Sequence, residues 1–206
     1  MTRRIAPAPA GVPALEPVRQ DLYDTKLQDG TVSTLEFFRN PGIAGLAELA
    51  TNMQANGQLP YPQQFHVFGL NLELVPYFPE EAQTGVDEAH WQNKKKVLET
   101  AFFRFHIGSK TYLIDPAKRI PASLGPVGFG TGAQAGINAF PTNGLQDIQH
   151  YYDVTIRQGG KIKPIHIPAQ QSFYVQVVWP FGNPAVEGGG WEVRAYLVGI
   201  LWREVQ

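Results

Sequence analysis

The 206-residue sequence contains no cysteine. Disulfide bonds, thiolate metal sites and cysteine nucleophiles are therefore excluded, and the redox compartment cannot be inferred. No run approaches the roughly 18 apolar residues of a membrane-spanning helix, so we expect no such span. The stretch MTRRIAPAPAGVPALEPVRQ begins with basic residues, but four prolines interrupt it before an apolar segment forms. That pattern is not typical of a signal peptide, and the sequence predicts a soluble protein that is not exported.

Charge is also scarce, because charged residues make up 17% of the chain, against about 25% in an ordinary soluble domain. The 17 Lys and Arg residues nearly balance the 18 Asp and Glu residues, which gives a formal net charge of −1. A surface built mainly to bind nucleic acid needs a clear basic excess, so this function is disfavoured except at a local patch. A surface with little charge and many aromatic residues is typical of a protein partly covered by other subunits.

Alternating apolar residues recur along most of the sequence, with glycines and prolines between the alternating segments. The predicted strands cover residues 64–76, 101–108, 109–116, 148–158, 163–180 and 191–205. A tight turn at Gly108 and Ser109 is expected to join the second and third of these into a hairpin. The first predicted strand places four residues on one face: Phe68, Leu70, Leu72 and Leu74.

The last predicted strand, residues 191–205, is apolar on both faces. One face carries Trp191, Val193, Leu197 and Leu201, and the other carries Tyr196, Val198, Ile200 and Trp202. A strand that is buried on both faces is either central in its sheet or covered by another subunit.

Two segments have helical periodicity, residues 40–58, which should end near Gly57, and residues 86–100. Many strands with only one or two short helices predict an all-β protein, an antiparallel β-sandwich of the jelly-roll type. The length fits one domain. We therefore expect an extended proline-rich N-terminal arm over residues 1–30 and a single sandwich domain over residues 31–206.

The first 20 residues contain four prolines, and residues 5–15 carry no polar side chain. Proline fixes φ and removes a hydrogen-bond donor, so this segment should be extended and without a core of its own. It is either a disordered tail or an arm that becomes ordered against a neighbouring subunit. Its apolar residues favour the arm, because a solvated tail normally carries more charge.

Three histidines, His66, His106 and His166, each lie between apolar residues within a predicted strand. Three imidazoles that converge inside a barrel bind zinc or iron, which would suit a metal-dependent β-barrel enzyme. The alternation argues against this site, because it places His106 and His166 opposite the apolar faces of their strands. The sequence also has no His-x-His pair. We therefore expect no metal and no cofactor.

Other catalytic patterns are weak. The glycine run GFGTGAQAG lacks the strand–helix context of a dinucleotide fingerprint and the Lys-Ser/Thr of a P-loop, so it is interpreted as a contact loop. No Gly-x-Ser-x-Gly exists around the three candidate nucleophiles, Ser109, Ser123 and Ser172. The acidic pairs Glu80–Glu81 and Asp87–Glu88 are explained by solvation at a helix start. The sequence predicts a protein that is not an enzyme.

Several strings taken together resemble structural proteins of bacterial viruses: STLEFFRN, ATNMQANGQLPYPQQFHVFGL, FRFHIGSKTYLIDPAKRIPASLG, PIHIPAQQSFYVQV and VRAYLVGILWREVQ. The most specific block is Thr51–Gly69. The resemblance covers residues from about 31 onward and implies a jelly-roll coat component of a virion, assembled in the host cytoplasm. It supplies no catalytic residues, and it does not extend to the N-terminal arm or to residues 86–100.

The sequence thus predicts a self-assembling capsid or capsid-associated subunit, in a coat, minor coat or cement role. Its partners would be copies of itself and other virion proteins, without a membrane span. The expected subunit contacts are Ile5, Pro7, Pro9, Val12, Pro13, Leu15, Phe129, Ile137 and Phe140. Weak contact with a packaged genome is expected at Arg3, Arg4, Lys94, Lys95 and Lys96, because NKKK is the densest basic run. The alternative is a virion-borne carbohydrate- or receptor-binding β-sandwich, in which aromatic residues stack on sugars.

Overall fold

A computed structural model of the chain describes residues 14–39, 50–76, 100–120, 126–129, 141–143, 151–158, 160–184 and 191–205. Strands make up 59% of the structure and helix only 3%, which confirms the predicted all-β class. The strands are β1 (Leu15–Arg19), β2 (Leu22–Gln28), β3 (Thr34–Phe37), β4 (Gln64–Pro76), β5 (Phe102–Ile107), β6 (Lys110–Pro116), β7 (Pro126–Phe129), β8 (Pro141–Asn143), β9 (Tyr152–Asp153), β10 (Ile156–Gln158), β11 (Lys161–Lys163), β12 (Ile165–Ile167), β13 (Phe173–Val178) and β14 (Trp191–Glu204). A 3-10 turn, η2 (Ala117–Arg119), follows β6. Within these ranges no helix is long and apolar enough to cross a membrane.

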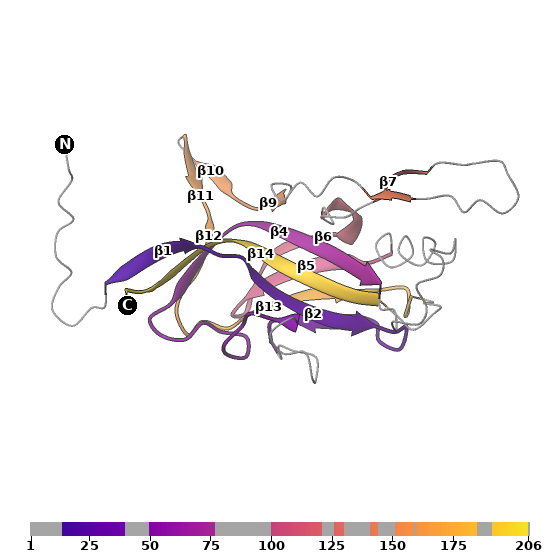
Figure 1. Cartoon of the computed structure of the whole chain (residues 1–206), viewed down its shortest axis with the longest axis horizontal. Coiled ribbons are helices and arrows are strands. Elements are labelled where there is room, and N and C mark those ends of the chain that lie inside the picture. The colour runs from indigo at the N-terminus through magenta and orange to yellow at the C-terminus, as the bar shows by residue number, and fades with distance from the viewer. Residues whose placement is uncertain are drawn as a thin grey trace, which may run out of the picture.

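Two antiparallel sheets form the body of the molecule (Figure 1). In the six-stranded sheet, β14 lies between β4 on one side and β1 and β2 on the other, and β4 also pairs with β12 and β9. The four-stranded sheet has the order β3-β13-β5-β6. Two smaller pairs, β10–β11 and β7–β8, complete the strands, and the β10–β11 hairpin projects from the body in Figure 1.

The core lies between the two sheets, because in most of their strands every second residue points inward. In β5 the burial alternates from Phe102 to Ile107, and β13 alternates in the same way from Phe173 to Val178. The largest fully buried side chains are mostly aromatic: Trp179, Phe37, Phe38, Phe65, Phe103, Phe105 and Phe173. Truncating one such phenylalanine to alanine typically costs about 3–5 kcal/mol, so this aromatic layer holds the sheets together.

The strand predictions agree with the structure at several places. The predicted strand 64–76 is β4, and the hairpin around Gly108 is β5–β6, with Gly108 at φ +58°. Residues 191–204 form β14, which has paired strands on both edges and is therefore central, one of the two alternatives that its apolar pattern left open.

A bulge in β4 overturns one predicted face. Val198 pairs with Gly69 but Gly199 pairs with Val67, so Phe68 is an extra residue in its strand. An extra residue reverses the side on which the following side chains lie. Phe68 is consequently half-buried on the outside of the sheet, whereas Leu70 is fully buried in the core.

Two predicted boundaries also differ from the structure. The arm expected to extend to residue 30 ends earlier, because residues 15–28 form β1 and β2, paired with β14. The helix expected to end near Gly57 has already ended after Ala50: Thr51 forms a β-bridge with Asp24, and the next residues are turns and extended chain. The rest of that helix and the helix 86–100 lie outside the described residues.

Eight of the ten strands in the two sheets, all except β1 and β9, pair in a simple order. Numbered along the chain, these strands are β2, β3, β4, β5, β6, β12, β13 and β14. The first pairs with the eighth, the third with the sixth, the second with the seventh and the fourth with the fifth. The first four of these strands therefore pair antiparallel with the last four. Two further pairings, β14 with β4 and β13 with β5, join the four strand pairs into two sheets.

Candidate functional site

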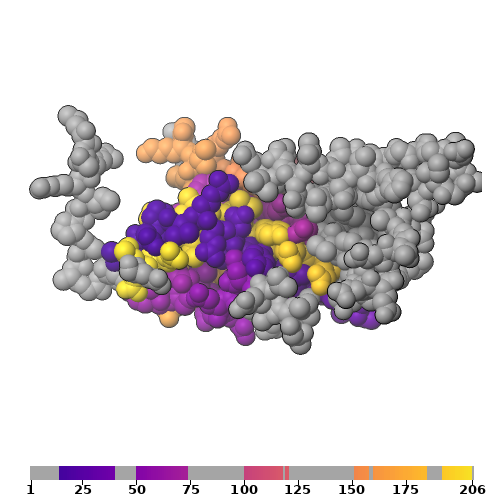
Figure 2. All heavy atoms as spheres, viewed as in Figure 1, coloured from indigo at the N-terminus to yellow at the C-terminus, as the bar shows by residue number. Residues whose placement is uncertain are grey.

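The outer face of the six-stranded sheet, which points away from the core, is the most distinctive surface of the protein. In Figure 2 the indigo side chains of the N-terminal strands lie beside the yellow side chains of β14 on this face. Three groups of residues follow one another along it: a polar network, an apolar groove and a pair of histidines.

The polar network connects β14, β2 and β4. The hydroxyl of Tyr196 donates to Glu73 Oε2 at 2.6 Å, and Arg194 Nη1 lies 3.6 Å from the same oxygen. Arg194 Nε donates to Thr25 Oγ1 at 2.8 Å, and the guanidinium lies 5.6 Å from the ring centre of Tyr23. Burial and the hydrogen bond to Glu73 raise the pKa of Tyr196 to about 12. The phenol therefore keeps its proton near neutral pH, and the network links three strands.

The apolar groove comes next and has a volume of about 480 Å³. Its lining is defined by Pro17, Arg19, Phe68, Tyr151, Val198, Gly199 and Ile200. Arg19 is the only ionisable side chain with a full charge among them, so the groove offers mainly hydrocarbon and aromatic surface.

Two glycines shape this groove from opposite sides of the sheet. A Cβ at Gly69 would lie 1.8 Å from Cδ2 of Tyr151, so the missing side chain lets the tyrosine ring lie on the outer face. A Cβ at Gly199 would lie 2.2 Å from the backbone oxygen of His66. Both glycines are next to the bulge at Phe68, where the paired strands approach closely.

The histidine pair lies beyond the groove, where His166 of β12 faces His66 of β4 across the two strands. Their ring centres are 5.0 Å apart, and Trp202 Nε1 donates to His66 Nδ1 at 3.3 Å. Gln64 Oε1 lies 3.1 Å from His166 Nε2. Burial, and secondarily the neighbouring His166, lower the pKa of His66.

The third histidine lies elsewhere, on the outer face of the four-stranded sheet. His106 stacks on Tyr174 with ring centres 4.5 Å apart, and its Nδ1 is 3.0 Å from Thr111 Oγ1. Burial, and secondarily the charge of Arg104, lower its pKa. The three imidazoles therefore lie outside the sandwich on two different sheets and do not converge. Among the residues that the structure describes, no three His, Asp or Glu side chains are grouped closely enough to hold a metal ion.

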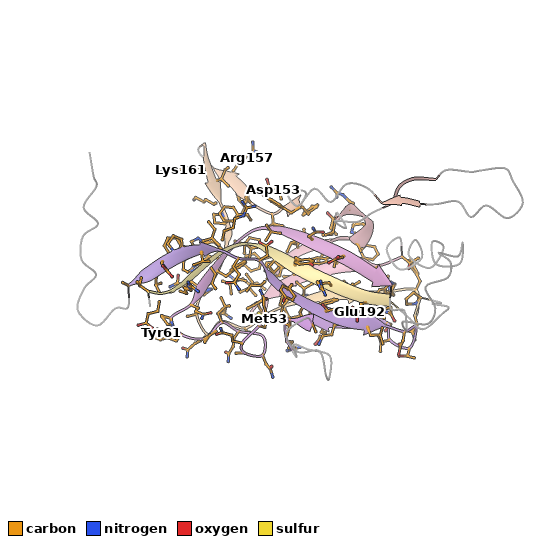
Figure 3. All side chains as sticks on the ribbon, viewed as in Figure 1. Met53, Tyr61, Asp153, Arg157, Lys161 and Glu192 are labelled. Carbon is orange, nitrogen blue, oxygen red and sulfur yellow. The ribbon has the colours of Figure 1, made fainter. Side chains whose placement is uncertain are left out.

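A second concave surface lies at one end of the sandwich, where the β3–β4 connection meets the ends of β1 and β14. We call it the amide-lined hollow, since five carboxamides line it: Gln20, Asn52, Gln54, Gln58 and Gln63. Its volume is about 450 Å³. Figure 3 labels Met53 and Tyr61, both of which line this hollow and lie along one side of the body.

The β10–β11 hairpin adds a small basic surface. Arg157, Lys161 and Lys163 are exposed there, and Ile156 and Ile162 are 64% and 59% exposed. Arg157 and Lys161 are labelled on this hairpin in Figure 3, and Asp153 is labelled on the neighbouring β9. The hairpin is within the segment that connects the fifth and sixth strands of the sandwich, so its side chains take no part in the core.

Of the residues expected from the sequence to contact other subunits, the structure places Leu15, which is half-buried in β1 opposite Glu204. Phe129 is in β7. The other expected contacts lie outside the described residues: Ile5, Pro7, Pro9, Val12, Pro13, Ile137 and Phe140. The same holds for the expected genome contacts Arg3, Arg4, Lys94, Lys95 and Lys96, for Ser123 and for the acidic pairs.

The sequence did not predict the groove or the hollow as sites. The only local signal for the groove was the apolar outer face of residues 191–205, which includes Val198 and Ile200. Comparisons with protein-family models, with curated proteins and with solved structures found no match for this chain.

Proposed function

We propose that this protein is a structural subunit of a virion, a jelly-roll coat, minor coat or cement protein that acts by self-assembly and carries out no catalysis. The strand order supports the jelly-roll part of the proposal. A jelly roll has eight strands in two sheets with two Greek keys, and it recurs in viral capsid proteins. A chain whose first half pairs antiparallel with its second half, and is then rolled into two sheets, produces such an arrangement.

The apolar groove is the observation that carries the assembly proposal. Phe68, Val198 and Ile200 are half-buried on the outside of a sheet whose core face is already filled. Apolar surface removed from water contributes about 25 cal/mol per Å², and a symmetric assembly repeats each contact in every subunit. Together with the low charge of the whole chain, this groove is well suited to receive apolar side chains of another molecule.

The occupant that we propose is the proline-rich segment 1–13 of a second copy. That segment supplies Ile5, Pro7, Pro9, Val12 and Pro13, and proline-rich chains bind aromatic-lined grooves at low entropic cost. Strand β1 runs from Leu15, opposite Glu204, to Arg19, opposite Ile200, so the start of β1 is its end farther from the groove. A segment attached there is better placed to reach a neighbouring molecule than to turn back to its own groove.

The proposal is tested by measuring molar mass with light scattering after size-exclusion chromatography, with electron microscopy of the largest species. The full chain is compared with a chain lacking residues 1–13 and with Ile200→Lys, which places a charge in the groove. Ile114→Lys is the matched control, because Ile114 is 62% exposed on the other sheet. We expect the full chain and the control to associate and the other two variants to remain monomeric.

A full chain that stays monomeric at its highest soluble concentration contradicts the assembly role. Association that survives both the truncation and Ile200→Lys contradicts the groove as the contact. Circular dichroism of each variant separates these outcomes from a failure to fold.

A further inference from the structure

The amide-lined hollow has no part in the proposed assembly, and its chemistry points to a ligand. Its five carboxamides each combine a donor NH₂ with an acceptor oxygen. A hydroxyl group is likewise both donor and acceptor, so a surface of carboxamides matches a molecule with many hydroxyls. Two members, Gln20 and Gln58, make no hydrogen bond within the part of the chain that the structure describes, which leaves this capacity for a ligand.

The hollow is also close to electrically neutral. Among the described residues that line it, Arg203 and Glu204 alone carry a full charge, and Arg203 Nε donates to Glu16 Oε1 at 3.0 Å. An anionic ligand would therefore find no uncompensated cation in the hollow, and a cationic ligand would meet only the exposed Glu204. This charge balance favours a neutral ligand.

An aromatic ring is present at the rim. Tyr61 lies between Pro60 and Pro62 and is 66% exposed, so its ring is accessible to a ligand. An aromatic ring has a negative face. The C–H groups on one face of a sugar ring carry partial positive charge, so they pack on an aromatic face while the hydroxyls at the ring's edge reach polar groups.

The wall of the hollow is held in place by hydrogen bonds to the sandwich. Asn52 accepts from the Tyr23 backbone N–H at 2.9 Å, and its amide donates to the Asp21 carbonyl at 2.6 Å. The Leu59 carbonyl accepts from the Gln170 N–H at 2.9 Å, and Leu59 itself is 3% exposed. A site built on such a rigid frame loses little conformational freedom when it binds a ligand.

We infer that the amide-lined hollow binds a neutral saccharide, with one sugar ring packed on Tyr61 and its hydroxyls bonded to the carboxamides of Gln20 and Gln58. The volume of about 450 Å³ lies within the usual range for small-molecule sites, roughly 300–1,000 Å³, and suits one or two sugar rings. The groove and the hollow use different residues, so a virion subunit with both would assemble through one surface and recognise glycans through the other.

The test is a titration of the ¹⁵N-labelled full chain followed by NMR. The probes are the methyl glycosides of glucose, galactose, mannose and N-acetylglucosamine, disaccharides of each, and methyl glucuronide as the charged counterpart. We expect at least one neutral probe to bind saturably and to shift the side-chain amide signals of Gln20 and Gln58.

Variants then locate the site. Tyr61→Ala should weaken binding about tenfold, and Gln58→Ala about fivefold, losses of the size that one ring contact or one hydrogen bond contributes. Tyr112→Ala is the matched control, since Tyr112 is 47% exposed on β6 outside the hollow, and its affinity should equal that of the unmodified chain.

Three results overturn the inference. The first is that no neutral probe saturates, and the second is that methyl glucuronide binds more tightly than every neutral probe. The third is that Tyr61→Ala and Gln58→Ala bind as well as the Tyr112→Ala control does. All three variants change exposed side chains, so their amide spectra should retain the folded pattern.

Discussion

Replacing Gly199 with alanine tests how closely β14 and β4 approach at the bulge. The new Cβ would lie 2.2 Å from the backbone oxygen of His66 and 2.7 Å from Cζ of Phe65. A backbone oxygen within a paired sheet cannot rotate away, so the two central strands would have to separate. The Gly199 N–H, which donates to Asp21 Oδ1 at 3.2 Å, would move with them.

Overfilling a packed site costs about 1–3 kcal/mol, and the backbone obstacle places Gly199→Ala at the upper end of that range. A weakened hydrogen bond to Asp21 adds about 1 kcal/mol. We therefore expect the free energy of unfolding to fall by about 3–4 kcal/mol. In a domain of this size each kcal/mol lowers Tm by roughly 2–4 °C, so Tm should fall by about 10 °C.

Gly69→Ala is the matched comparison, because the obstacle there is a side chain. Its Cβ would meet the ring of Tyr151, a half-buried side chain on the outer face, and a side chain moves more easily than a backbone oxygen within a sheet. We expect a loss of about 1 kcal/mol, the low end of the overpacking range. Because the ring would leave the apolar groove, Gly69→Ala should also weaken self-association.

Urea unfolding followed by tryptophan fluorescence measures both variants, with Trp179 as a buried reporter. The slope with denaturant should stay constant while the midpoint moves, as expected when only stability changes. The reasoning is refuted if Gly199→Ala is within about 0.5 kcal/mol of the unmodified chain, a change typical of a neutral surface substitution. It is also refuted if Gly69→Ala is the more destabilising of the two.

Three further predictions concern buried polar groups. Asp24→Ala should lower the free energy of unfolding in urea by about 2–3 kcal/mol, because the fully buried carboxylate accepts the Phe38 N–H at 2.7 Å. Asp24→Asn keeps an acceptor and should lower it less. Equal losses in the two variants would contradict this reasoning. Burial lowers the pKa values of His66 and His106 in the folded protein, so the unfolded chain takes up protons first and stability should fall as the pH drops below about 6.5. The urea midpoint should therefore decrease on acidification, less steeply in a His66→Gln/His106→Gln double variant, and an identical pH dependence in both proteins would disprove the assignment. Ultraviolet titrations of the unmodified chain and of Tyr196→Phe should differ by one phenol that ionises near pH 12. If the phenol missing from the variant ionises near pH 10, the bond between Tyr196 and Glu73 is contradicted.

The strands that the sequence predicted correctly are those whose buried positions are apolar. In β4, β5 and β13 the inward residues are nearly all Phe, Val, Leu or Ile, so a period of two is visible in the letters. The sequence did not predict strand β2, because three of its four buried residues are polar: Asp24, Thr25 and Gln28, beside Leu22. Strand β1 was not predicted either, because it contains Pro17. A proline is tolerated there because β1 lies at the edge of the sheet.

The two candidate sites were beyond local patterns for a different reason. The groove combines Pro17, Phe68, Tyr151 and Val198, which are far apart in the sequence and meet only through strand pairing. A bulge at Phe68 then moves that ring from the expected inner side to the outer one. Strict alternation of apolar residues assumes that no residue is inserted into a strand. It therefore cannot predict the bulge at Phe68, which helps to build the groove.

The pairing of the first strands with the last one has a consequence during synthesis of the chain. Strands β2 and β4 both need β14 as a neighbour, yet residues 191–204 leave the ribosome more than a hundred residues after Pro76. At about 5–20 residues per second the nascent β2 and β4 therefore wait for several seconds or longer with one edge open. We expect this polypeptide to complete its folding only after residue 204 has been made, and to depend on chaperones that shield open strand edges during the delay.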